Sequence, residues 1–301
     1  MTSTPPTTEI WSYQATRDRP LDDLPVLPTT VVRLLALERE SPSYFDDLAT
    51  VIRSDPALVV KVLAVANSAM YRSGKQVVRI RDAILRLGAE TTARVVLART
   101  AVRVAVPHRE VERDLWVHAL RVAHLARHLA APCDQDVTPA HDAYVCGLLH
   151  DLGRFVLMNE APYALDAMRE AAFHKPSDML AAEKVLLGID HAALGADAAR
   201  RWGLPAPIVA VIDRHHRPTS ELDPLSRMAA LVHVADQLDF ADAPSHRLDD
   251  ATIRAVLEQS LPQWYPLSHS ETRTHLRDAL ANAECAIGLT LPFRRGRTRA
   301  S

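Results

Sequence analysis

The sequence has few cysteines, few glycines and no long apolar run. Its three cysteines, Cys133, Cys146 and Cys285, form no CxxC pair, and an odd number argues against a framework of disulfides. No window approaches the roughly 18 uninterrupted apolar residues of a membrane span. The first twenty residues lack the basic-then-apolar pattern of a signal peptide. We therefore expect a cytoplasmic protein with reduced thiols and no membrane contact.

The composition is that of an ordinary soluble protein. Hydrophobic residues make up 48% and charged residues 24% of the 301 residues. The formal net charge of −2 gives no general reason to expect a nucleic-acid partner or an anionic membrane. One ratio stands out, because 14 histidines accompany only five phenylalanines. Excess histidine alone is weak evidence for a metal site, so the positions of these residues have to decide.

Helical periodicity covers almost the whole chain between two polar ends. In "SDPALVVKVLAVANSA", Asp55 is a natural N-cap and Pro56 stands at the first helical position, where its missing N–H costs nothing. Gly88 predicts a break between two helices. Twenty prolines cluster at the joints between helical segments, and no segment shows sustained strand alternation. The sequence predicts an all-α, multi-helix bundle, with an N-terminal helical subdomain packed on a second one.

Composition and periodicity suggest where the parts of the chain begin and end. We predict a mobile tail at residues 1–22, an N-terminal helical part at 23–107, a second helical part at 108–240, C-terminal helices at 241–290 and a basic tail at 291–301. The C-terminal helices either cover the bundle or mediate a homodimer, and the sequence does not separate the two. In the N-terminal part, Asn67 and Tyr71 can share one helix face. We favour a packing contact with the second part there over a partner-docking surface.

Several polar residues fall on apolar helix faces. At 100° per residue His118 lies inside the stripe of Leu115 and Val122, whereas His124 and His128 fall on the other side. By the same test seven more residues point inward, and Asp239 lies closer than Asp236 to the middle of their stripe. The seven are His150, Asp151, His191, His215, His216, Asp236 and Asp239. Gly147 precedes the His150–Asp151 pair and would allow another segment to approach closely.

Buried histidines and aspartates need partners, because an unpaired buried polar group costs roughly 1–3 kcal/mol. Each residue taken singly is more often a hydrogen-bonded core residue than a metal ligand. Together they form a set of imidazoles and carboxylates that suits a divalent Mn, Fe, Ni or Zn ion. A buried hydrogen-bond network without metal remains the alternative interpretation.

The ordered set of residues resembles the HD superfamily of metal-dependent phosphohydrolases, whose pattern is H…HD…D on a helical bundle. More specifically, the chain resembles HDOD-domain proteins, bacterial signalling relatives of the HD-GYP cyclic-di-GMP phosphodiesterases. The N-terminal half carries "LPVLPTTVVRLLAL", "IRSDPALVVKVLAVANSAMYR" and "IRDAILRLGAETTARVVLA". The second half carries "AYVCGLLHDLGRFVL", "GIDHAALGADAARRWGLPAPIVAVIDRHH" and "LVHVADQLD". The match runs from about residue 24 to residue 240.

The resemblance implies roles for the inward-facing residues. The superfamily's metal ligands fall on His118, His150, Asp151 and Asp236, and the extra histidines of the HD-GYP branch fall on His191, His215 and His216. It implies one or two divalent metal ions per chain, with Asp151 bridging two ions and orienting an attacking water.

Two departures from the HD-GYP pattern affect the expected function. The branch usually has lysine after "HDxG", and here that position is Arg154, whose fork suits a phosphate but not proton shuttling. The Gly-Tyr-Pro segment expected after the double histidine is absent, and "HHRPTSELDPLSRM" stands in its place.

Because of these departures we expect first a signalling or regulatory protein that acts through a protein partner or a nucleotide second messenger. The alternative is a metal-dependent phosphohydrolase acting on a nucleotide or cyclic dinucleotide, with Asp151 and Arg154 as catalytic residues.

Overall fold

The chain forms helices throughout the part that the structure describes. The computed structural model describes residues 28–71, 74–100, 110–134, 138–171, 176–217, 223–242, 250–276 and 279. Fourteen α-helices and no strand are present within these ranges, so the predicted all-α fold is confirmed. None of these helices is both long and apolar enough to cross a membrane. The tails predicted at residues 1–22 and 291–301 lie outside the described residues.

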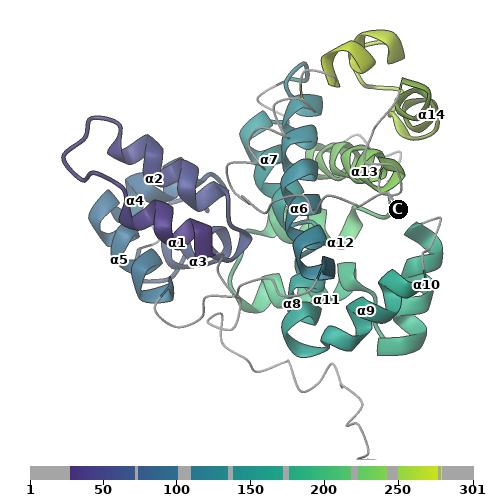
Figure 1. Cartoon of the computed structure of the whole chain (residues 1–301). Coiled ribbons are helices and arrows are strands. Elements are labelled where there is room, and N and C mark those ends of the chain that lie inside the picture. Colours follow the sequence, from purple (N-terminus) through teal and green to yellow (C-terminus); the bar gives the residue numbers. More distant parts are fainter. Residues whose placement is uncertain are drawn as a thin grey trace, which may run out of the picture.

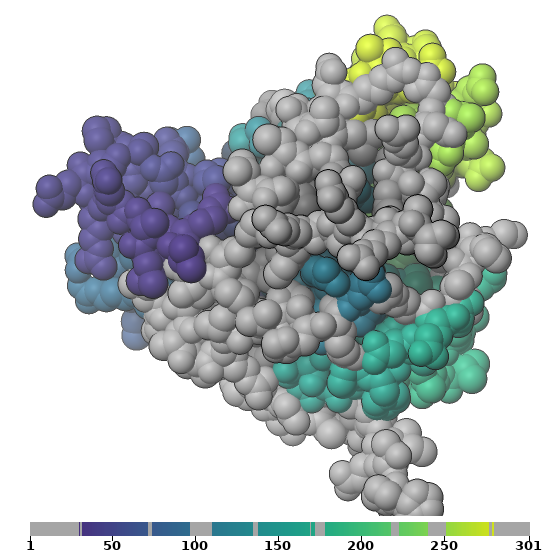
Figure 2. Space-filling model, in the orientation of Figure 1, coloured from purple at the N-terminus to yellow at the C-terminus, as the bar shows by residue number. Residues whose placement is uncertain are grey.

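Five helices near the N-terminus pack on one another and form a lobe at one side of the molecule (Figures 1 and 2). They are α1 (Pro28–Leu35), α2 (Tyr44–Arg53), α3 (Pro56–Ala66), α4 (Ile80–Leu87) and α5 (Ala89–Thr100). The helix α3 is the centre of this lobe, because Leu58, Val62 and Leu63 are fully buried. Asp55 caps α3 as predicted, since its carboxylate accepts a hydrogen bond from the N–H of Ala57 at 3.0 Å.

A loop between α3 and α4 is fixed by a single amide. The Asn67 side chain donates to the carbonyl of Val77 at 2.8 Å and accepts from the N–H of Val77 at 2.9 Å. The same amide nitrogen donates to the carbonyl of Leu63 at 2.9 Å. Our expectation that the face of Asn67 and Tyr71 packs against the second part stays a prediction. The amide of Asn67 pairs with backbone groups of its own lobe. Its partner Val77 is ten residues away, so the sequence gives no sign of this contact.

The other nine helices begin with a long antiparallel pair. They are α6 (Glu110–Ala130), α7 (Ala140–Leu149), α8 (Leu152–Glu160), α9 (Pro162–Glu170), α10 (Pro176–Leu187), α11 (His191–Arg201), α12 (Ala206–Arg214), α13 (Pro224–Asp242) and α14 (Asp250–Ser260). The pair α6 and α7 packs closely because Gly147 faces the α6 backbone. A Cβ atom at Gly147 would lie 2.9 Å from Ala123 Cα and from the carbonyl oxygen of Val122. The close approach expected at Gly147 is thus present.

A second glycine contact joins α8 to α11. A Cβ atom at Gly153 would lie 2.0 Å from the carbonyl oxygen of His191 and 2.9 Å from the N atom of Gly195. A Cβ atom at Gly195 would in turn lie 2.6 Å from the N atom of Gly153. Only two glycines allow the backbones to cross this closely. The crossing brings the first residue of α11, His191, against the start of α8.

The C-terminal helices cover the end of α6. The hydroxyl of Tyr265 donates to the carbonyl of Leu129 at 2.8 Å, and His275 Nε2 lies 2.9 Å from the carbonyl of His128. Both carbonyls lie in the last turn of α6 and also accept from residues just past the helix, His128 from the N–H of Ala131 and Leu129 from Cys133 Sγ. Residues beyond 279 lie outside the described part, so the homodimer alternative for this segment stays a prediction.

Candidate metal centre

The seven residues predicted as metal ligands are brought together from separate helices. His118 comes from the middle of α6, and His150 with Asp151 occupies the junction of α7 and α8. His191 begins α11, His215 and His216 follow α12, and Asp236 lies on α13. Of the seven, His118 and His216 are partly exposed and the other five are buried. Their role as metal ligands stays a prediction.

Asp151 lies at the centre of this group. Its Oδ2 atom is 3.3 Å from His118 Nε2, and its Oδ1 atom is 3.0 Å from His191 Nε2 and 3.7 Å from His215 Nε2. His150 Nε2 also lies 3.6 Å from Oδ1, so imidazoles of both groups face this one carboxylate. A carboxylate with this placement is suited to bridge two cations.

The donor atoms fall into two groups that share Asp151. One group consists of Asp151, His191, His215 and His216, and the other consists of His118, His150 and Asp151. Within each group the candidate ligand atoms lie within 4.8 Å of one another. Asp236 joins the second group, since its Oδ1 atom is 3.4 Å from His118 Nε2 and 3.7 Å from His150 Nε2. This histidine and aspartate cluster can bind metal.

Three buried polar atoms in the cluster have no hydrogen-bond partner. They are His215 Nε2, His216 Nδ1 and Asp236 Oδ2. Such atoms are rare in proteins because each costs the desolvation free energy of an unmade bond. A divalent cation fits them, since imidazole nitrogens and carboxylate oxygens are ligands for Mn, Fe, Ni and Zn.

The imidazoles are oriented by bonds at their second nitrogen. His150 Nδ1 lies 2.7 Å from the carbonyl of Gly147, and His215 Nδ1 lies 2.7 Å from the carbonyl of Ile212. A carbonyl accepts only, so both Nδ1 atoms carry the proton and both Nε2 atoms present a lone pair to the cluster. Metal-binding histidines are held in this way in other proteins.

Carboxylates hold two more of the five rings, those of His118 and His191. His118 Nδ1 lies 2.7 Å from Asp239 Oδ2, and the other Asp239 oxygen accepts from Arg121 at 3.3 Å. His191 Nδ1 lies 2.7 Å from Glu183 Oε2, and the same oxygen accepts from the His191 backbone N–H at 2.9 Å. Both rings therefore also turn Nε2 toward Asp151.

Arg154 neutralises part of the negative charge in the cluster. Its guanidinium lies 3.3 Å from Asp151 Oδ2 and 4.0 Å from Glu183 Oε1. Burial works against the charge of Asp151, but the charges of Arg154 and the histidines outweigh it and hold the pKa of Asp151 well below its usual range. The carboxylate of Asp151 is thus ionised and available as a ligand at neutral pH.

The histidines divide into two classes by charge. Burial disfavours the charged form of His118, but hydrogen bonds with Asp151 and Asp239 outweigh it and raise the pKa of His118 to about 10. Burial also disfavours charge on His191, but Glu183 and Asp151 raise its pKa to about 9. Burial lowers the pKa of His216 to about 3. Without metal, His118 and His191 hold protons in positions that a cation would take, and metal binding has to release them.

Sequence reasoning missed Glu183 and gave Asp239 no role. Glu183 is buried on α10 between Met179 and Leu187, each four residues away and also buried. A carboxylate inside an apolar i, i+4 stripe is the signal that could have revealed it. Asp239 was noted on the inner face of its helix, but its partner His118 lies 121 residues earlier in the sequence.

The HDOD domain family model matches residues 24–218, which is well over half of the chain. This chain belongs to the HDOD family. The match begins before α1 and ends just after His215 and His216, so it includes every cluster residue except those on α13.

Individual proteins are similar to this chain over most of its length. An uncharacterised protein of Treponema pallidum is 29% identical over 249 residues, which are 81% of this chain and 48% of that protein. The chain thus spans about half the length of this relative. The MmoQ response regulator of Methylococcus capsulatus shares the fold with a TM-score of 0.65 and 19% identity over 86% of this chain and 98% of that one.

A candidate phosphohydrolase of Shewanella amazonensis also has this fold. Its TM-score is 0.53, with 24% identity over 92% of this chain and 97% of that one. At these identities the two structures establish the fold alone.

Proposed function

We propose that this HDOD protein is a signalling or regulatory protein whose histidine–aspartate cluster binds one or two divalent metal ions. The proposal depends on one observation, namely that two groups of donor atoms share the carboxylate of Asp151. His118, His150 and Asp236 would complete the ligands on one side, and His191, His215 and His216 on the other. We expect Mn, Fe, Ni or Zn, because the donors are a mixture of imidazoles and carboxylates.

The chemistry of the cluster separates this proposal from a purely structural hydrogen-bond network. A network without metal would pair its polar atoms with one another, and three buried atoms here have no such partner.

The output of the metal-bound protein would be binding of a protein partner or a nucleotide. The fold occurs in a response regulator, which is consistent with a signalling role but does not assign one. The segment after His216 has no Gly-Tyr-Pro sequence, so the usual route to cyclic-di-GMP hydrolysis lacks one of its parts.

Elemental analysis tests the proposal directly. Protein purified without a chelator should contain about one or two equivalents of Mn, Fe, Ni or Zn per chain, and Asp151→Ala should lose them while its helix content by circular dichroism stays the same. His128→Ala is a matched control, since His128 lies on α6 like His118 but contacts His275 instead of the cluster. No metal in the wild type, even after addition of Mn or Fe, would reject the proposal.

A second function, metal-dependent phosphohydrolysis, is favoured by the position of Arg154. Its guanidinium lies beside Asp151, where its planar donors could hold a phosphate of a nucleotide or cyclic dinucleotide. When bound, a metal pair would acidify a water and polarise a phosphoryl oxygen. Asp151 would orient the water, and Arg154 would position the phosphate.

The hydrolase alternative has its own test. Metal-loaded protein should hydrolyse bis(p-nitrophenyl) phosphate, and Arg154→Ala should lower the rate at least tenfold while keeping the metal. Arg154→Lys should recover part of the rate if the charge is what matters. No turnover by the metal-loaded wild type on this probe or on a panel of nucleotides would leave the binding role as the function.

A further inference from the structure

A second group of basic side chains meets where the N-terminal lobe contacts the helices α6 and α7. It consists of Arg33 on α1, Arg53 on α2, His124 and Arg127 on α6, and His141 on α7. We call these five residues the junction cluster. Arg127 and His141 are exposed and the other three are partly buried. None of them belongs to the metal centre.

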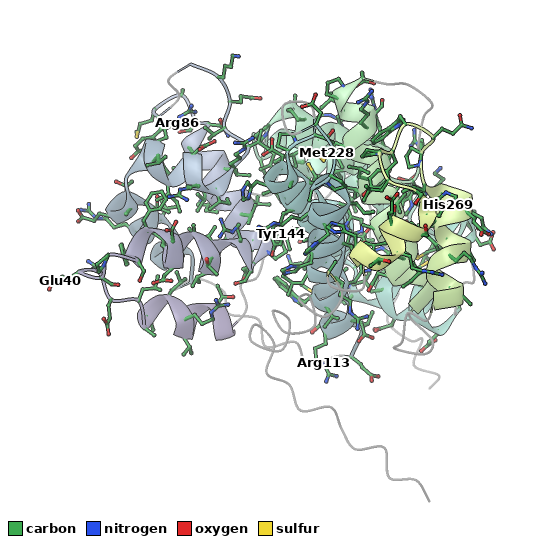
Figure 3. All side chains as sticks on the ribbon, turned by 90° about the horizontal axis from the view of Figure 1, so that it is seen from above. Glu40, Arg86, Arg113, Tyr144, Met228 and His269 are labelled. Carbon is green, nitrogen blue, oxygen red and sulfur yellow. The ribbon has the colours of Figure 1, made fainter. Side chains whose placement is uncertain are left out.

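Tyr144 holds the junction cluster together. Its hydroxyl donates to the carbonyl of Arg53 at 3.3 Å, and its ring lies 5.3 Å from the ring of His124 in an edge-to-face arrangement. Figure 3 shows Tyr144 between the N-terminal helices and the rest of the molecule. Arg33 Nη1 lies 3.4 Å from Ser54 Oγ, next to Arg53. Arg127 is one helical turn beyond His124 and shares its face.

The positive charges of the junction cluster are only partly balanced by carboxylates. Within the described residues none of the five forms an ion pair with a carboxylate. Asp46 acts on Arg53 and Asp142 acts on His141, but each acts more weakly than Arg127 does. Both carboxylates also have other partners, because Asp46 lies 3.5 Å from Arg81 and Asp142 lies 2.8 Å from Arg79. Like charges brought together without counter-ions repel one another, and an anionic ligand would remove that cost.

The two histidines of the cluster are neutral at neutral pH, so its positive charge comes from the three arginines. Burial lowers the pKa of Arg53, and the charge of Arg127 lowers it further. Burial lowers the pKa of His124 to about 4, again with Arg127 as the next cause. Burial and then the charges of Arg127 and Arg53 lower the pKa of His141. Arg127 is thus close enough to three members of the cluster to act on their charge.

Helix dipoles explain only part of this arrangement. Arg33, Arg53 and Arg127 each lie in the last turn of a helix. The helix dipole places about half a negative charge there, which favours a cation. Three arginines against three half charges leave a positive excess. The dipoles also give no reason for the three helix ends to converge on one place.

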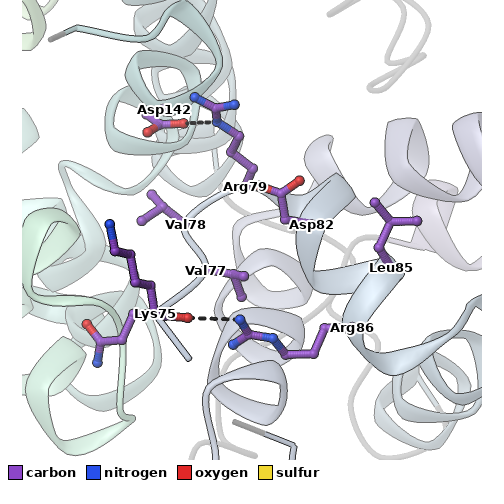
Figure 4. A pocket seen from close by; sticks show the side chains of 9 residues that line it. Lys75, Val77, Val78, Arg79, Asp82, Leu85, Arg86 and Asp142 are labelled. Carbon is purple, nitrogen blue, oxygen red and sulfur yellow. Dashed lines mark hydrogen bonds and ion pairs between the residues drawn. The ribbon is translucent and has the colours of Figure 1, made fainter. Parts of the chain in front are cut away.

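A cleft beside α4 comes next to the cluster at Asp142, the neighbour of His141. It has a volume of about 420 Å³, and Figure 4 shows Lys75, Arg79 and Arg86 around it. Val77 and Val78 give it apolar lining, and Asp82 and Asp142 add two carboxylates. Arg79 bonds Asp142 through Nε alone, so its two terminal nitrogens are free for a ligand within the described residues.

We propose that the junction cluster and the adjoining cleft bind a small phosphate-bearing ligand of nucleotide size, at a site separate from the metal centre. Arg53, Arg127 and His124 would contact the phosphate, and the cleft would take the less polar body of the ligand. The cleft volume lies in the range of small-molecule sites. The net charge of −2 argues against a general polyanion surface.

A ligand at this site would contact both parts of the molecule. Arg33 and Arg53 belong to the N-terminal lobe, whereas His124, Arg127 and His141 belong to the helices that carry the metal centre. A ligand that contacts both groups would fix one lobe relative to the other. Such a ligand is an input that a signalling protein could use, whether or not the metal centre turns over a substrate.

Isothermal titration with ADP tests the proposal. Wild type and Asp151→Ala should bind ADP with similar affinity, because the site does not use the metal. The double variant Arg53→Gln, Arg127→Gln should bind at least tenfold more weakly, with unchanged melting temperature and metal content. Arg200→Gln is the matched control, since Arg200 is equally exposed but lies on α11 away from the junction. Arg127→Lys should recover part of the affinity.

Three results would overturn the proposal. The first is no binding of ADP or inorganic phosphate by the wild type at low salt, where surface charges are least screened. The second is binding that Asp151→Ala abolishes and the junction variants leave intact, which would place the ligand in the metal centre. The third is a single-stranded RNA oligonucleotide that binds the junction more than tenfold more tightly than ADP, which would identify a polyanion surface instead.

Discussion

Glu183 on α10 accepts two hydrogen bonds from His191, one from its backbone N–H and one from its ring nitrogen Nδ1, at 2.9 and 2.7 Å. One carboxylate oxygen thus fixes both the start of α11 and the direction of the imidazole. The other oxygen lies 4.0 Å from Arg154, which also contacts Asp151. Glu183 is therefore a positioning residue for the cluster, although it does not face the proposed metal ions itself.

Replacement of Glu183 should weaken metal binding without removing it. Losing a carboxylate that orients a metal-binding histidine costs roughly 10–100-fold in affinity. We expect that loss for Glu183→Ala and a smaller one for Glu183→Gln, whose amide oxygen can still accept from His191. Competition with a chelator gives the affinity, and Glu258→Gln on the exposed face of α14 is the control. Equal affinity in wild type and Glu183→Ala would show that the contact serves folding alone.

The crossing of α8 and α11 at two glycines should tolerate substitution as poorly as the proposed metal ligands do. In Gly153→Ala the new Cβ atom would lie 2.0 Å from the carbonyl oxygen of His191, so the backbone has to move. Overpacking of this kind costs about 1–3 kcal/mol. Because His191 moves with it, metal affinity should fall together with the midpoint of thermal unfolding.

Gly74→Ala provides a control for this effect. Gly74 has a φ of +73°, so alanine there is strained, but nothing lies within 4 Å of its added Cβ atom. Its stability should fall while its metal content stays that of the wild type. If Gly153→Ala behaved in the same way, the crossing would stabilise the fold without placing His191.

Parts of this centre could be predicted from the sequence, because helical periodicity is a local property. It places His118 on the face of Leu115 and Val122, and those two residues are buried in the structure. That seven residues from separate helices meet around Asp151 was implied by the resemblance to the HD superfamily. Periodicity shows only that each one faces inward.

Other parts depend on tertiary contacts that no local pattern carries. In the sequence Gly153 and Gly195 are ordinary small residues, and only the structure shows that α8 and α11 cross at them. Asn67 likewise marks only the end of a helix, and its bond to Val77 appears only in the structure. The junction cluster escaped notice for the same reason, since Arg33 and Arg127 are 94 positions apart in the printed sequence. Charges spread along a chain give no sign of where a fold gathers them.

The amide of Asn67 should make a measurable contribution to the N-terminal lobe. Asn67→Ala leaves the N–H and the carbonyl of Val77 without their partners, at a cost of about 1–3 kcal/mol. Asn67→Asp should be at least as unstable, because it sets a carboxylate oxygen against the carbonyls of Leu63 and Val77. Urea unfolding gives both values. An aspartate variant as stable as the wild type would rule out the amide donors as the cause.

His124 should make the protein less stable in mild acid. Burial, then the charges of Arg127 and His128, lower its pKa from 6.5 to about 4 in the folded state. Between these values the unfolded chain binds a proton that the folded chain does not, so stability is lost as the pH falls through this window, by no more than about 3 kcal/mol. In His124→Gln the unfolding midpoint should therefore depend less on pH between 6.5 and 4. The exposed His269→Gln should follow the wild type, and parallel curves for wild type and His124→Gln would contradict the assignment of this loss to His124.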